Sequence, residues 1–170
     1  MLPDYLGPGL DVVLVGINPG LRSAERGHHF AGRGNKFWDL LWESGLVPRR
    51  LSCEEDHRLL EFGIGLTNIV ARASRSSSEL RRADYTKGRR VLARKLRRHR
   101  PGLVALVGLT VLRQLWEGRA PQGIGCGLRR ERFASLPLFV LPNPSGRNAH
   151  YRYEAMLEHW RGLAVWLGRA

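Results

Sequence analysis

Short apolar runs rich in Val, Ile and Leu recur along the chain, separated by amphipathic stretches. The runs at Val12 to Ile17, Leu103 to Val107 and Leu138 to Leu141 are continuous rather than alternating. Such continuity is typical of strands that are buried on both faces of a sheet. A weaker run covers Gly65 to Val70. We therefore predict a buried strand in each of these segments.

Between the runs, apolar residues three and four positions apart predict helices. The predicted helices are Asn35 to Ser44, Cys53 to Glu61, Ser78 to Arg98, Thr110 to Trp116 and Arg152 to Leu167. Alternating strands and helices imply right-handed crossovers and a mostly parallel sheet with helices on both faces. The predicted fold class is therefore α/β, as a three-layer α/β/α sandwich. A turn-rich connection, Gly118 to Arg132, has room for a short edge strand.

Length and composition indicate one folding unit. The 170 residues are 43% hydrophobic and contain no internal repeat or linker, so we expect a single domain over residues 1–170. No apolar stretch approaches the roughly 18 to 20 residues that span a bilayer, and no signal-peptide pattern is present. Cys53 and Cys126 lack the spacing of metal ligands or of a disulfide framework. We expect a cytoplasmic protein with no metal and no membrane association.

The net charge points to a polyanionic partner. Lys and Arg number 28 against 15 Asp and Glu, which gives +13 and a sequence pI near 11.2. Nucleic acid is the partner that this balance favours, ahead of a membrane surface or an acidic protein. The densest basic stretch, Arg81 to Arg100, follows a helical pattern. Either a solvated helix face or a face that contacts phosphates explains it.

An asparagine follows each of three predicted strands. Asn18 stands in "GINPG", Asn68 in "LTNIVAR" and Asn143 in "LPNPSGRNAHY". In a parallel sheet these loops share the carboxyl edge, where α/β folds bind ligands. Asparagine is also a common turn residue. The convergence nevertheless indicates a site at this edge.

The same loops restrict the chemistry of such a site. They contain neither a GxGxxG nor a GxxxxGK[ST] pattern and no carboxylate, and Asp11 starts its strand at the opposite edge. An amide is a poor general base at neutral pH, but it can hold a water molecule. Hydrolysis of an N-glycosidic bond to a nucleobase suits a held water, because the base leaves as an anion that fixed donors stabilise.

With these residues in place, the sequence resembles the mismatch-specific uracil and thymine DNA glycosylase family, a branch of the uracil-DNA glycosylase superfamily. "GINPGLRSAERGHHFAGRGNKFW", "GIGLTNIVAR" and "LPNPSGRNA" correspond to its three recognisable blocks, in the same order. The resemblance extends over nearly the whole chain. It implies a monofunctional glycosylase that excises uracil from mismatched duplex DNA without a cofactor and leaves an abasic site.

The resemblance also implies roles for individual residues. Asn18 would position the hydrolytic water, Phe30 would stack on the extruded base, and Ser23 would crowd a thymine methyl group. The other residues implied for the base pocket are Gly16, Ile17, Gly20, His29 and Asn68. Because Ser23 follows the uracil-preferring pattern whereas "GHHFAGRGN" follows the thymine-processing one, the sequence is mixed between the two.

The third block resembles the family's DNA-inserting loop. Arg147 falls where the family inserts a side chain into the space that the flipped base leaves. Ser145 and Gly146 would contact a phosphate, Asn148 the unpaired partner base, and Lys36 the DNA backbone. Asn143 completes the residues expected to bind DNA.

We therefore expect a monomeric bacterial enzyme, cytoplasmic and nucleoid-associated, that acts on G·U or related mismatches to initiate base excision repair. A non-catalytic binder of damaged or single-stranded DNA on the same fold is the alternative, and Asn18 favours the enzyme. A nucleotide-binding α/β regulator is a weaker alternative, because the phosphate loop is missing and the net charge is positive.

Overall fold

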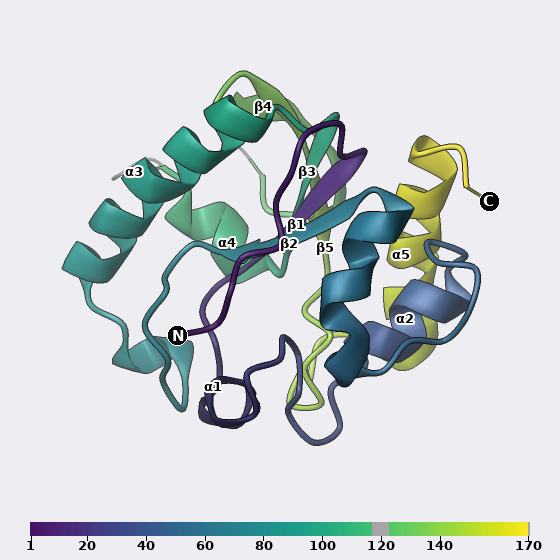
Figure 1. The fold of residues 1–170 in the computed structure, drawn as a ribbon, viewed down its shortest axis with the longest axis horizontal. Coiled ribbons are helices and arrows are strands. Elements are labelled where there is room, and N and C mark those ends of the chain that lie inside the picture. The colour runs from purple at the N-terminus through teal and green to yellow at the C-terminus, as the bar shows by residue number, and fades with distance from the viewer. Residues whose placement is uncertain (117–122, 170) are drawn as a thin grey trace.

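A five-stranded sheet with the strand order β2-β1-β3-β5-β4 forms the centre of the fold (Figure 1). The computed structural model describes residues 1–116 and 123–169. The strands are β1 (Val12–Gly16), β2 (Ile64–Asn68), β3 (Leu103–Val107), β4 (Gly127–Phe133) and β5 (Leu136–Leu141). Neighbouring strands are parallel except for β4, which is antiparallel to β5. The predicted mostly parallel sheet is confirmed.

The edge strand β4 starts in the connection predicted from Gly118 to Arg132 and ends one residue past it, at Phe133. Its residues alternate between half-buried and exposed, so only one of its faces meets the core. A strand that is half solvated needs no continuous apolar run, which explains its weak sequence signal. Residues 118–122 of that connection lie outside the described residues.

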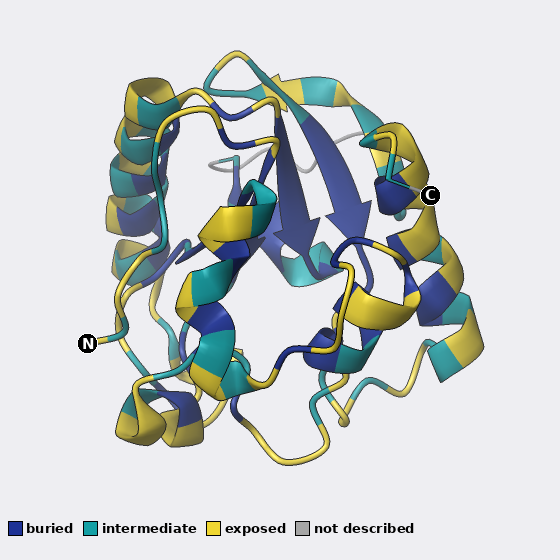
Figure 2. Ribbon diagram, turned by 45° about the vertical axis from the view of Figure 1, so that its right-hand side comes forward, coloured by how far each residue is buried: buried dark blue, intermediate teal, exposed yellow. Residues whose placement is uncertain are grey.

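Helices cover both faces of the sheet, as the three-layer prediction requires. The helices are α1 (Leu21–Arg26), α2 (Phe37–Glu43), α3 (Arg82–His99), α4 (Leu109–Gln114) and α5 (Tyr153–Trp166), with the 3₁₀ helices η1 (Cys53–Phe62) and η2 (Ser77–Glu79). In β1, Val12 and Leu14 join a core cluster with α2, η1 and α5, whereas Val13 and Val15 join a second cluster with α3 and α4. Strands β1 and β3 are accordingly buried on both sides along their whole length, and β2 and β5 over most of theirs (Figure 2).

Two helix predictions need correction, and one helix has no prediction. The segment predicted from Ser78 to Arg98 divides into η2 and α3, because Leu80 and Arg81 adopt extended backbone between them. The predicted helix at Cys53 is a 3₁₀ helix. Helix α1 was not predicted, because Ser23 is its one buried residue and it therefore has no apolar periodicity.

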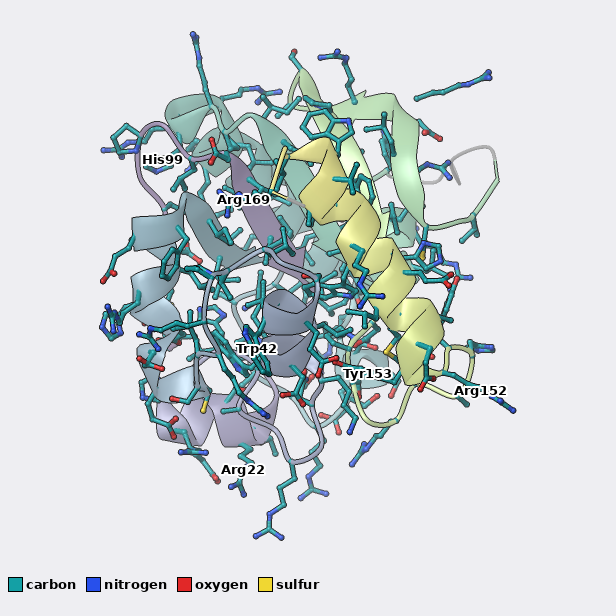
Figure 3. The ribbon with its side chains drawn as sticks, turned by 90° about the vertical axis from the view of Figure 1, so that its right-hand side faces the viewer. Arg22, Trp42, His99, Arg152, Tyr153 and Arg169 are labelled. Atoms are coloured by element: carbon teal, nitrogen blue, oxygen red, sulfur yellow. The ribbon has the colours of Figure 1, made fainter. Side chains whose placement is uncertain are left out.

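The two edges of the sheet differ in the residues they hold. At the amino edge, Asp11 accepts a hydrogen bond from Arg169 at 2.7 Å. Helix α1, which carries Arg22, follows β1 at the carboxyl edge, and Arg22 and Arg169 lie toward opposite ends of the molecule (Figure 3). Within the described residues, no helix combines the length and apolar character needed to cross a membrane.

Candidate active site

The amide of Asn18 is held in one orientation at the carboxyl edge of the sheet. Its Nδ2 donates to the Arg72 carbonyl and to Ser74 Oγ, at 2.8 Å each. The Ser74 hydroxyl donates in turn to the Ser76 carbonyl at 2.8 Å, so Ser74 Oγ must accept from Asn18. Since both amide protons are used, Oδ1 is the atom of Asn18 that can accept a hydrogen bond from a water molecule.

Parallel pairing of β1 and β2 brings these partners to Asn18. The pairing continues past the strands, because Val70 N donates to the Ile17 carbonyl at 2.8 Å and Ser74 N donates to the Pro19 carbonyl at 3.1 Å. Ser74 is thereby buried. Sequence reasoning missed Ser74 and Arg72, since a stretch of Ser and Arg is typical of an exposed loop. The signal that could have identified them is their position just after β2.

Gly16, Asn68 and Phe30 meet beside Asn18, at the ends of β1 and β2. Gly16 and Asn68 are register partners in the sheet. A Cβ atom at Gly16 would lie 2.5 Å from Asn68 Oδ1 and 3.8 Å from Phe30 Cζ. The first two sequence blocks therefore converge here, and the absence of a side chain at Gly16 leaves room for the Asn68 amide.

We expect Gly16→Ala to displace the Asn68 amide, because no normal contact is as short as 2.5 Å. Overpacking of this kind costs about 1–3 kcal/mol in the free energy of unfolding, and misplacing a recognition group by about 1 Å lowers the reaction rate about 100-fold. Gly7→Ala is the matched control, since its Cβ would meet no atom within 4 Å, its φ lies outside the left-handed region, and Gly7 has no role in the site. Thermal unfolding and single-turnover base release measure both effects. Equal behaviour of the two variants would contradict this account.

Phe30 holds a left-handed backbone conformation with φ of 52°. An aromatic residue rarely adopts it, and such strain costs on the order of 1–3 kcal/mol. The Phe30 ring stacks on Phe37, with centroids 3.8 Å apart and planes 10° from parallel. Strain of this kind persists where surrounding contacts over-determine the conformation, and it often marks a functional position.

Hydrogen bonds on both sides of Phe30 fix this conformation. Before it, His29 N donates to Asp56 Oδ2 at 2.9 Å. After it, Ala31 N donates to Ser23 Oγ at 3.0 Å. The Phe30 carbonyl accepts from the indole Nε1 of Trp38 at 3.3 Å. The stacking ring is therefore held by buried side chains from η1, α1 and α2.

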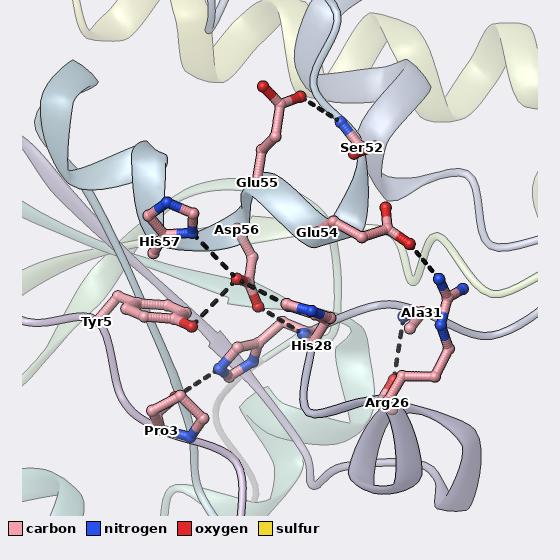
Figure 4. Close-up of polar contacts among 12 residues, drawn as sticks. Pro3, Tyr5, Arg26, His28, Ala31, Ser52, Glu54, Glu55, Asp56 and His57 are labelled. Carbon is pink, nitrogen blue, oxygen red and sulfur yellow. Dashed lines mark hydrogen bonds and ion pairs between the residues drawn. The ribbon is translucent and has the colours of Figure 1, made fainter.

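Asp56 is a fully buried carboxylate that sequence reasoning missed (Figure 4). Its Oδ1 accepts from Tyr5 Oη at 3.1 Å and lies 3.2 Å from His28 Nδ1, with His57 Nδ1 at 4.0 Å. Burial, followed by the charge of Asp56, raises the pKa of Tyr5 to about 12, so the phenol remains a donor at neutral pH. The carboxylate therefore joins η1 to the N-terminal segment and to the loop before Phe30.

His29 and Ser23, both expected in the base pocket, make specific contacts with the protein. The buried His29 ring places Nε2 2.7 Å from the Pro3 carbonyl and lies 5.6 Å from the Tyr5 ring. Ser23 is buried and uses Oγ to accept from Ala31. Both side chains thus support the Phe30 loop.

The third block forms a braced loop after β5. Asn143 Oδ1 accepts from Ser145 N at 2.9 Å, and the Asn143 carbonyl accepts from Asn148 Nδ2 at 2.9 Å. Ser145 Oγ accepts from Arg147 N at 3.2 Å. Among the described residues the Arg147 guanidinium has no polar partner, and Arg147 is exposed. These short-range bonds present its side chain to solvent.

This loop packs against the end of the first block. Lys36 N donates to the Pro144 carbonyl at 2.8 Å, and Lys36 itself is exposed. A Cβ at Gly146 would lie 2.8 Å from the Gly34 carbonyl, so a glycine here permits contact between the two loops. The first and third blocks therefore form one surface at the carboxyl edge.

The three asparagines share this edge but not one cluster. Asn18 and Asn68 lie at the adjacent ends of β1 and β2. Asn143 lies past β5, where its Cβ is 3.4 Å from the Cβ position of Gly108. Asn143 braces its loop, and the convergence expected for three asparagines holds for two of them.

Within residues 1–116 and 123–169, no group of three or more His, Cys, Asp or Glu side chains is arranged to hold a metal ion. A model of one protein family matches the chain from residue 3 to residue 164, and its description is "Uracil DNA glycosylase superfamily". The match includes every residue of the site described above.

Proposed function

Because the chain belongs to the uracil DNA glycosylase superfamily, whose members are DNA glycosylases acting on DNA, we propose that it removes uracil from mismatched duplex DNA. The observation that carries this proposal is the fixed amide of Asn18, whose Nδ2 is used by two acceptors. Such an amide presents an acceptor to a water molecule at the edge where the DNA-inserting loop also lies. We propose that the enzyme is a monofunctional, monomeric glycosylase of the mismatch-specific branch.

In the proposed reaction, the target nucleotide leaves the helix and its sugar C1′ approaches Asn18. The bond between uracil N1 and C1′ breaks, and uracil leaves with the electron pair as an anion. Asn18 Oδ1 accepts a hydrogen bond from a water molecule whose oxygen bonds to C1′. That water loses one proton and uracil N1 gains one, so the products are free uracil and an abasic site.

The uracil would lie against Phe30, with its edge toward Asn68 and Gly16. The contact between Asn68 Oδ1 and the open face of Gly16 supports this arrangement, as does the stacking of Phe30 on Phe37. In this proposal Ser23 restricts the space for a 5-methyl group, while the backbone of His29 and Ile17 borders the base. A pocket discriminates one methyl group by about 1–3 kcal/mol, so we expect a preference for uracil over thymine.

Arg147 would enter the space left by the flipped base and bond the unpaired guanine, with Asn148 beside it. Ser145 and Lys36 would contact the phosphates, and Asn143 and Gly146 would hold the loop. The exposed guanidinium of Arg147 and the packing of its loop on Gly34 support this role.

We expect Arg147→Ala to lower the efficiency of cleavage of G·U duplexes by about 10-fold or more, since an arginine–base contact contributes about 1–3 kcal/mol. Cleavage of uracil in single-stranded DNA should change much less, because no helix needs to be filled. Arg161→Ala removes the same charge from an exposed position of α5 and is the control. Equal losses on duplex and single strand would reject the inserting role.

The proposed function is tested with labelled duplexes that contain G·U, A·U or G·T, followed by alkali. We expect alkali-labile sites in the order G·U, A·U, G·T. Tight binding of the G·U duplex without alkali-labile sites would instead identify a non-catalytic DNA-binding protein. Equal cleavage of G·U and A·U would retain the glycosylase but remove its mismatch specificity.

A further inference from the structure

The exposed face of α3 carries a concentrated positive charge. The helix contains eight Lys or Arg residues and one acidic residue, Asp84. We define the α3 basic stripe by its exposed cations: Arg82, Lys87, Arg90, Arg94, Arg97 and Arg98. The buried residues of α3 face the sheet, so the stripe faces solvent.

The cations of the stripe differ from most arginines on the other side of the sheet. Near η1 and α2, arginines pair with carboxylates: Arg26 with Glu54, Arg49 with Glu55, Arg50 with Asp39, and Arg58 with Glu61. On α3, Asp84 is occupied by Arg72, and Lys95 pairs with Asp4. Among the described residues, no carboxylate forms an ion pair with a cation of the stripe. A general excess of arginine does not explain this segregation.

The stripe begins beside the candidate site, and its other end lies far from that site. Its first turn joins the site, because Asp84 pairs with Arg72, whose carbonyl binds Asn18. Arg97 lies about 22 Å further along the helix axis, at a rise of about 1.5 Å per residue. Helix α3 ends near the start of β3, and its last residue, His99, lies toward the end of the molecule opposite Arg22 (Figure 3). DNA seated on the site would therefore leave much of the stripe uncovered.

We propose that the α3 basic stripe binds a second segment of duplex DNA while the first occupies the candidate site. This inference rests on the proposed function for the identity of the partner. Duplex DNA places about one negative charge per 1.7 Å of its axis, so a stripe of this length meets many phosphates. Small side chains, Ala83 and Ala93, lie between the arginines and permit close approach. Tyr85, the one Phe, Tyr or Trp residue of α3, is buried, and Phe133, which lies beside Arg90 and Arg94, is half-buried and packs edge-on against Trp116. Among the described residues the stripe therefore has no row of exposed rings for stacking successive single-stranded bases.

The experiment measures transfer between DNA segments. A fluorescent undamaged duplex is bound by the protein, and its release is followed after mixing with increasing concentrations of unlabelled duplex. We expect the release rate constant to rise in proportion to competitor concentration, because the second duplex binds before the first leaves. The triple variant Arg90→Ala, Arg94→Ala, Arg97→Ala should lose this dependence, while alanine preserves the helix.

The matched control is the triple variant Arg49→Ala, Arg50→Ala, Arg58→Ala, which removes the same charge from the other side of the sheet. It should keep the dependence on competitor concentration. Both triple variants should release uracil from a short duplex at the wild-type single-turnover rate. Because transfer is measured without cleavage, an inactive wild-type protein would reject the proposed function without changing this readout.

A release rate that is independent of competitor in the wild type would overturn the proposal, as would an unchanged dependence in the α3 variant. Poly-L-glutamate and single-stranded DNA serve as further competitors. If poly-L-glutamate accelerated release through the stripe and duplex DNA did not, the stripe would be a site for an acidic protein. If single-stranded DNA accelerated release and duplex DNA did not, the proposal that the stripe binds a second duplex would likewise be rejected.

Discussion

Asn18→Ala is expected to lower the single-turnover rate of uracil release by about 100- to 10,000-fold, the usual contribution of a side chain that positions or activates the reacting water. The structure gives the reason, because both protons of the Asn18 amide are used by Arg72 and Ser74, which leaves Oδ1 as the atom that can accept a hydrogen bond from a water molecule. Alanine provides no acceptor for the water. DNA affinity, measured by fluorescence anisotropy on an undamaged duplex, should remain close to wild type.

Ser74→Ala provides the graded control for this prediction. It removes one of the two acceptors and leaves the Arg72 carbonyl, so the amide of Asn18 is held less firmly. We expect a loss of activity smaller than that of Asn18→Ala. If Asn18→Ala retained wild-type turnover, the water-positioning role would be wrong, whatever the result for Ser74→Ala.

Asp56→Ala is expected to lower the free energy of unfolding by about 3 kcal/mol, measured by urea denaturation. The substitution leaves the part-buried Tyr5 Oη and the buried His29 N without their acceptor, and an unsatisfied buried donor costs about 1–3 kcal/mol. Since His29 precedes the strained Phe30, base release should also slow. Asp56→Asn keeps one acceptor oxygen at the same place and should recover part of the stability.

A general loss of stability would leave the environment of Phe30 unchanged in the folded protein. The indole N–H resonance of Trp38 reports that environment, because it donates to the Phe30 carbonyl. We expect this resonance to shift in folded Asp56→Asn. Asp11→Ala removes an exposed carboxylate paired with Arg169, and such pairs contribute about 0–1 kcal/mol. An unshifted Trp38 resonance in Asp56→Asn, or an equal destabilisation by both alanine variants, would contradict the role given to Asp56.

The sequence predicted β1, β2, β3 and β5 well because these strands are buried on both faces over most of their length, unlike the edge strand β4. The run at β1 is apolar throughout, since Val13 and Leu14 point into different clusters and both need to be hydrophobic. A continuous apolar run of this kind can be recognised in a single sequence. Helix α1 has no such signal, because its contribution is Ser23 Oγ, which accepts a hydrogen bond from Ala31 N. Its existence depends on tertiary contacts.

The same distinction applies to the candidate site, where some residues could be predicted from the sequence and others could not. Asn18 and Asn68 could be placed from the order of parallel strands, because adjacent strands end at the same edge. Asp56 and Ser74 could not, since their partners lie 27 and 56 positions away, in His29 and Asn18. The His29 ring was expected near the base, but its contact with the Pro3 carbonyl depends on where the N-terminal segment packs. Sequence reasoning found the residues proposed for the chemistry and missed those that hold them.

The most direct test of the account is the quantity of free uracil released from a G·U duplex under single-turnover conditions. Chromatography measures the uracil, and alkali cleavage of the same sample measures abasic sites. We expect equal amounts of both from the wild-type protein, and in the same time only the small amounts from Asn18→Ala that a rate about 100- to 10,000-fold lower allows. A wild-type protein that binds the duplex and releases no uracil would contradict the central claim that the fixed Asn18 amide serves a glycosylase.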